Sequence, residues 1–183
     1  MSRRAQQPFH VQVISTGVRQ APYALNGLLH HESDLDIEDH FTDTGGYTDQ
    51  IFALFHLLGY RFAPPLRRFN DCVLYTPAKT TDYPLLDPMI GGRINPRLIQ
   101  QRWDGVLRLA SSVKLGTVTA SLVLQRLSRY ARQNDLAQAL QESGRIEKTL
   151  FMLTWLQDPA LRQRAQVARY ADPQRRQDSR QRD

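Results

Sequence analysis

Residues 40–64 read HFTDTGGYTDQIFALFHLLGYRFAP and carry the strongest structural signal in the chain. Asp43 stands just before a paired-glycine turn, and an apolar segment follows from residue 51. Its large apolar residues cover most of a helix circumference: Ile51, Phe52, Leu54, Phe55, Leu57 and Leu58. A helix that is apolar nearly all round is buried, so we expect a buried helix that begins at Thr48 and stops at Gly59.

The flanking residues predict a small α/β part over residues 1–94. Phe9, Val11 and Val13 alternate with polar residues, as in a half-buried strand. We expect a short helix over residues 24–31, a second strand ending at 40–43 and a third at 72–75. Residues 77–96 hold four prolines and a glycine pair, so they are expected to form a loop.

From residue 95 onward the pattern becomes helical. Asn95-Pro96 is a capping residue followed by proline at the first helical position, and Gly116 closes that helix. A second helix is expected to open at Thr117, and a third to run over about 134–157 with an interruption at Gly144. We therefore predict a helical part over residues 95–162. Residues 163–183 are rich in arginine and glutamine, and we expect disorder there.

Composition narrows the class of protein. The chain has 183 residues, a net charge of +6 and one cysteine, Cys72. Its length suits one domain or slightly more, and its charge is compatible with a polyanionic partner but is also common in proteins that bind none. A single cysteine excludes an internal disulfide framework. No apolar run is long enough to span a membrane and no signal peptide is evident, so we expect a soluble, cytoplasmic protein.

Asp43 is the leading candidate for chemistry. Carboxylates at strand ends beside glycine turns are suitable ligands for hard cations such as Mg²⁺. The alternative is that Asp43 only caps its turn, as Asp before Gly often does. Asp49 lies in the first turn of the next helix, where a negative charge favours the helix dipole, and its default role is structural. The histidines lack the spacing of a metal site.

Arg126, Arg129 and Arg132 follow one another at three-residue steps. Such residues lie close together on a helix and its exit. They are either an ordinary solvated face or a set of contacts to a phosphate backbone.

Several motifs resemble a known family. The run HESDLDIEDHFTDTGGYTDQIFALFHLLGYRFAP is similar to the region around the second catalytic aspartate of the Tn-three family of replicative transposases. The likeness extends over about residues 8–162 and includes GTVTAS, YARQN and GRIEKTLFMLTWLQDP. It implies a partial ribonuclease-H-like core with a mostly helical insertion, about residues 95–157. It also implies two Mg²⁺ ions held by Asp, Asp and Glu for DNA strand cleavage and strand transfer, with Asp43 as the second Asp.

The chain departs from that pattern at the other two acids. The first aspartate is expected upstream of Met1, and the third acid near Pro173, yet no glutamate follows Glu147. We therefore expect a transposase fragment that is inactive alone and whose partners are DNA and an intact transposase or a second copy. One alternative is a basic DNA-binding or interaction module that modulates intact transposase. Another is one piece of a split enzyme.

Overall fold

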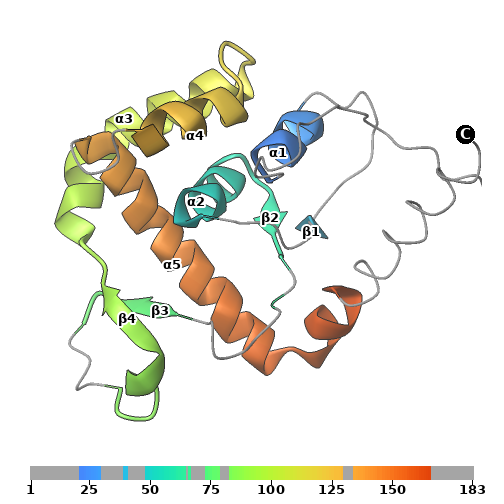
Figure 1. Ribbon diagram of the computed structural model, residues 1–183, viewed down its shortest axis with the longest axis vertical. Helices are drawn as coiled ribbons and strands as arrows, with labels where there is room; N and C mark the ends of the chain where they lie inside the picture. The colour runs from blue at the N-terminus through green and yellow to red at the C-terminus, as the bar shows by residue number, and fades with distance from the viewer. Residues whose placement is uncertain are drawn as a thin grey trace, which may run out of the picture.

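The computed structural model describes residues 21–29, 39–40, 48–64, 66, 73–78, 83–129 and 134–165. Helices predominate over short strands, so the mixed class expected from the sequence is confirmed (Figure 1). The elements follow in the order α1 (Ala21–Leu29), β1 (Asp39–His40), α2 (Asp49–Leu57), β2 (Arg61–Phe62), β3 (Leu74–Thr76), η3 (Asp87–Met89), β4 (Ile90–Arg93), α3 (Pro96–Lys114), α4 (Ala120–Arg129) and α5 (Asp135–Gln157). Residues 159–165 are also helical.

The described strands form two small parallel pairs. β1 pairs with β2, with Asp39 opposite Arg61 and His40 opposite Phe62. Parallel neighbours need a crossover connection, and α2 lies in the chain between these two strands. β3 pairs with β4 in the same sense. The expected strand at residues 9–14 lies outside the described residues, as does most of the predicted tail.

β4 corrects the prediction of a loop over residues 77–96. Its sequence, IGGR, has one β-branched residue, Ile90, followed by a glycine pair, and it lacks the alternation that signals a strand. Gly91 leaves room for the Val73 side chain, whereas a Cβ at Gly92 would make only ordinary contacts with Tyr75. A Cβ at Gly91 would lie 2.1 Å from Val73 Cγ1. Strand formation here depends on the partner strand, which the local pattern does not reveal.

Helix α2 is buried as predicted. Its residues from Gln50 to Phe55 are all buried, and Leu54 and Phe55 have no exposed surface. Thr48 occupies the N-cap, although its side chain makes no capping hydrogen bond. Gly59 has a φ of 89°, the left-handed conformation that favours glycine just past a helix end.

Helix α3 begins and ends as predicted, whereas α4 begins later than expected. The side chain of Asn95 accepts a hydrogen bond from the Leu98 amide, and Pro96 follows it. The amides of Thr117 and Val118 still bond back to Ser112 of α3, so α4 starts only at Ala120. Asn26 of α1 accepts a hydrogen bond from the Ala120 amide at 2.8 Å. A distant side chain therefore helps to fix this helix start.

Helix α5 runs through Gly144 without the predicted interruption. Gly144 lies against the first turn of α2, where an added Cβ would come within 1.7 Å of the Asp49 carbonyl oxygen. The glycine is therefore a point of close helix contact rather than a break. Figure 1 shows α5 as the long helix beside α2.

One hydrophobic core joins both halves of the described chain. Leu25 and Leu28 of α1, Phe55 of α2 and Leu140 of α5 are essentially fully buried in it. The proposed boundary between residues 94 and 95 is not tested by this packing and stays a prediction. No helix in the described ranges combines the length and the apolar character needed to cross a membrane.

We expect Gly144→Ala to destabilise the fold because its methyl group would overlap backbone atoms that cannot rotate away. A loss of about 1–3 kcal/mol is typical of such overpacking. Gly105→Ala in α3 is the matched control, since its Cβ would meet only the end of the Leu136 side chain at 3.1 Å. Urea unfolding of both variants should show a loss for Gly144→Ala alone. Equal stability of the two would contradict the close contact.

Candidate functional site

The structure does not describe Asp43, the leading site residue. Residues 41–47 connect β1 to α2 and lie outside the described ranges. Arg126 and Arg129 are exposed on α4, while Arg132 also lies outside. Among the residues that are described, no three His, Cys, Asp or Glu side chains gather as a metal site would require. The roles predicted for Asp43 and the three arginines therefore stay predictions.

Asp49, six residues after Asp43, lies at the centre of a largely buried charge cluster between α2 and α5. Lys148 Nζ lies 2.9 Å from Asp49 Oδ1, and Arg145 Nε lies 3.5 Å from Asp49 Oδ2. Gln141 donates to the same carboxylate at 3.4 Å. Only 11% of the Asp49 side chain is exposed. Lys148 is therefore its closest charged partner, and Arg145 supports it at longer range.

Arg145 extends the cluster to two further elements. Its guanidinium group donates to Glu142 and lies 4.5 Å from the centre of the Tyr75 ring in β3. Glu142 in turn accepts a hydrogen bond from the Asn95 amide at the start of α3. A cation over an aromatic face is attracted by the ring quadrupole. The cluster thus ties together α2, α5, β3 and α3.

This arrangement decides what Asp49 can do. The positive charges of Lys148 and Arg145 beside this carboxylate oppose the approach of a metal ion. Asp49 therefore has a second structural role in addition to the one expected at the start of α2: it joins α2 to α5 through ion pairs. The sequence did not reveal its partners. Gln141, Arg145 and Lys148 recur at helical spacing on one face of α5, but nothing local says what that face meets.

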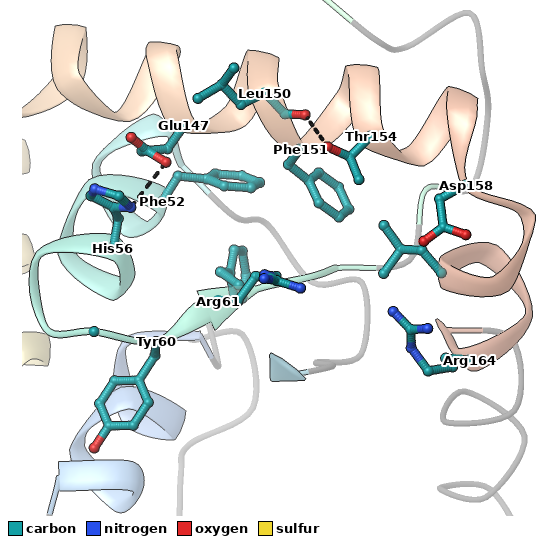
Figure 2. Close-up of a pocket in the computed structure, with 13 residues that line it drawn as sticks. Phe52, His56, Tyr60, Arg61, Glu147, Leu150, Phe151, Thr154, Asp158 and Arg164 are labelled. Carbon is teal, nitrogen blue, oxygen red and sulfur yellow. Dashed lines mark hydrogen bonds and ion pairs between the residues drawn. The ribbon is translucent and has the colours of Figure 1, made fainter. Parts of the chain in front are cut away.

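A pocket of about 710 Å³ lies near the opposite end of α2. Its lining combines buried aromatic rings with charged side chains from α2, β2, α5 and residues 159–165 (Figure 2). The Phe52 ring centre lies 5.0 Å from that of Phe62 and 5.7 Å from that of Phe151. Arg61 and Arg164 are exposed at its rim. The sequence reasoning did not identify this pocket, because its residues come together only in the fold.

Glu147 is the unusual titratable group in this pocket. Its carboxylate lies 3.2 Å from His56 Nδ1. Burial raises the pKa of Glu147 above its ordinary value, and the opposing effect of His56 is smaller. Asp158, also in the lining, accepts a hydrogen bond from the Ala160 amide at the start of the last helical segment. Both acids of the pocket thus have local partners.

The Asp49 cluster predicts a large difference between two otherwise similar substitutions. Asp49→Asn removes the carboxylate partner of Lys148 and one of the two carboxylates near Arg145, and we expect a loss of about 2–3 kcal/mol. This loss is smaller than the roughly 3–5 kcal/mol that is typical when one partner of a fully buried ion pair is removed, because Glu142 still compensates Arg145. Asp135→Asn, also in the first turn of a helix, breaks only the exposed pair with Arg102 and should cost under about 1 kcal/mol. Chemical denaturation of both variants checks this, and equal losses would contradict it.

The raised pKa of Glu147 predicts a pH dependence of stability. The folded protein holds this proton to higher pH than the unfolded chain, so this group's contribution to stability falls as pH rises from about 4.5 through the raised pKa. Glu147→Gln has no carboxyl to titrate, so it does not lose stability with rising pH at this position. We expect the variant to gain stability over the native chain at pH 7 and to lose this gain towards pH 4.

Urea unfolding between pH 4 and 8 measures the effect. His56→Gln is the control, because it leaves the Glu147 carboxyl in place and should move the titration of that carboxyl to higher pH. A uniform loss of stability in Glu147→Gln at every pH would instead mean that the carboxylate acts mainly as a stabilising ion-pair partner.

Comparison with known proteins identifies relatives of this chain. Residues 1–169 match the family described as Tn3 transposase DDE domain. The chain is 57% identical over 157 residues to the transposase for transposon Tn501 of Pseudomonas aeruginosa and 55% identical over 157 residues to that for Tn21 of Escherichia coli. It is 51% identical over 158 residues to the transposase for Tn1546 of Enterococcus faecium. Each alignment covers 86% of this chain.

These alignments cover only 16% of the length of those relatives, so the chain corresponds to a small part of each. No solved structure matches it significantly. The resemblance inferred from the motifs is confirmed, because the match extends over most of the sequence. The chain belongs to the Tn3 transposase DDE domain family.

Proposed function

We propose that these residues form part of the catalytic domain of a DNA transposase, with Asp43 as the second acid of its triad. The match to the DDE domain over residues 1–169 is the observation that carries this proposal. The position of Asp43 supports it. It follows the carboxyl end of β1 by three residues, and ligands of α/β proteins commonly bind beyond the carboxyl ends of parallel strands. The proposal includes a ribonuclease-H-like arrangement of the complete core.

The chemistry of the residues present fits part of a Mg²⁺ site. Asp43 offers the hard carboxylate oxygen that this cation prefers. Bound Mg²⁺ would stabilise the charge that develops on the phosphate during strand cleavage and transfer. In the described part of the chain Asp49 and Glu142 are paired with cations, and Glu147 is paired with His56. None of these three is therefore proposed as a second metal ligand.

From this follows a proposal about the chain by itself. One acid does not place two metal ions, and catalysis of phosphoryl transfer depends almost entirely on positioning and charge stabilisation. The 183-residue chain alone should neither nick nor join DNA that carries transposon ends. The proposed partners are transposon DNA and either an intact transposase or a second copy of this chain.

Magnesium-dependent nicking of end-containing DNA tests this directly. We expect no cleavage above background by the native chain, and an Asp43→Ala sample should behave identically. Cleavage that disappears in Asp43→Ala would contradict the proposed inactivity, although it would still support a catalytic Asp43.

The role of Asp43 needs an active context. The transposase for Tn501 offers one, because its matching segment can be replaced by the aligned residues of this chain. We expect this chimera to transpose, and Asp43→Asn within it to lower strand cleavage by at least about a thousandfold, as removal of an essential group does. Asp135→Asn is the matched control and should stay active. An active Asp43→Asn chimera would rule Asp43 out as a catalytic ligand.

A further inference from the structure

The distribution of acidic residues along the chain is uneven. The sequence contains 18 Asp and Glu residues, yet none lies between residues 105 and 134. That acid-free stretch includes the C-terminal part of α3, all of α4 and five basic residues: Arg108, Lys114, Arg126, Arg129 and Arg132. The last of these lies outside the described residues. A stretch of this length that carries one sign of charge creates a local positive potential.

The fold turns the four described cations outwards. In α4 the residues Val123, Leu124 and Leu127 are buried, whereas Arg126 and Arg129 are exposed. In α3 the residues Val106, Ala110 and Val113 face the core, and Arg108 and Lys114 are exposed. Both helices lie in the upper part of the view in Figure 1. We refer to this set of exposed cations, Arg108 and Lys114 of α3 with Arg126 and Arg129 of α4, as the basic face.

The basic face differs from the cations of α5 in how its charges are used. Arg145 and Lys148 are compensated by carboxylates, and Arg162 donates to the last carbonyls of α5. The side chains of the basic face make no ion pair or hydrogen bond with any other described residue. Lys114, Arg126 and Arg129 lie in the last turns of their helices, where the dipole favours a cation. That preference explains their position along the helix but not the absence of acids from residues 105–134 of the sequence.

The N-terminus of α4 does not contribute an anion site of its own. The Ala120 amide already donates to Asn26, and the Leu122 amide donates to Thr119. The proposed recognition of an anion therefore relies on the four side chains. Exposed Lys and Arg side chains without carboxylate partners are what a sequence-independent contact to DNA phosphates requires.

We propose that the basic face docks on the phosphate backbone of duplex DNA, independently of sequence. The inference rests on DNA as the partner of the function proposed above, but not on a catalytic role for Asp43. It separates two tasks within the chain. Asp43 would serve the reacting strand, and the exposed cations of α3 and α4 would hold the duplex by charge alone.

Fluorescence anisotropy of the 183-residue chain with labelled duplexes, with and without transposon-end sequence, tests the proposal. Affinity for the two duplexes should be equal. Four phosphate contacts predict a loss of about a hundredfold in affinity between 50 and 200 mM salt. A strong preference for the end sequence, tighter binding to a single strand, or no binding at all would overturn the proposal.

Double substitutions assign the binding to the face. Arg126→Gln with Arg129→Gln, and separately Arg108→Gln with Lys114→Gln, should each weaken binding about tenfold and lower the salt slope by about 2. Arg93→Gln with Arg97→Gln removes the same charge from exposed positions outside the acid-free stretch and should change affinity less than about twofold. Equal losses in this control would show that only net charge matters and would overturn the assignment.

One further variant separates the possible causes of a loss. Arg126→Lys with Arg129→Lys should retain most of the binding, because a phosphate contact requires charge. A loss as large as that of the Gln variant would overturn the backbone mode. The docking proposal is tested by anisotropy and the catalytic proposal by strand cleavage in the chimera, so failure of the one and failure of the other give different results.

Discussion

The contact between α5 and the first turn of α2 is the constraint on which the rest of the described structure depends. Gly144 brings the two backbones so close that a methyl group would not fit, and the Asp49 carboxylate is held by Lys148 and Arg145. Gln50 adds a hydrogen bond from its side chain to the Ala137 carbonyl. These contacts join residues nearly a hundred positions apart. The close approach at Gly144 and the ion pairs of Asp49 depend on each other, because both require the same position of α5 against α2.

The other elements are arranged around α5. It packs against α2, α3 and β3, and its Thr149 accepts a hydrogen bond from the Tyr75 amide. The segment that carries Asp43 enters α2 at the turn that α5 holds. The α5 contact therefore fixes one end of the connection between β1 and α2. The aromatic pocket with Glu147 and His56 lies near the other end of α2, so the pocket and the Asp49 cluster both lie between α2 and α5.

The local sequence pattern was sufficient to predict the strongly periodic helices. It was insufficient where contacts between distant residues determine the secondary structure. The apolar run after Thr48 and the Asn95-Pro96 cap predicted α2 and α3, because burial and capping are encoded in neighbouring residues. β4 was missed because IGGR becomes a strand only beside β3. Gly144 was wrongly read as a break because helical propensity ignores what a close-packed neighbour requires.

In the candidate site, too, some features follow from the sequence and others only from the tertiary structure. The sequence by itself determined that Asp43 precedes the glycine pair, that the family motifs surround it, and that acids are absent from residues 105–134. Only the tertiary structure decided which charges are compensated. Helical spacing places Arg145 and Lys148 on a face of α5 just as it places Arg126 and Arg129 on a face of α4. One face meets Asp49 and the other meets solvent, and that difference depends on how helices pack, which a period of 3.6 residues does not contain.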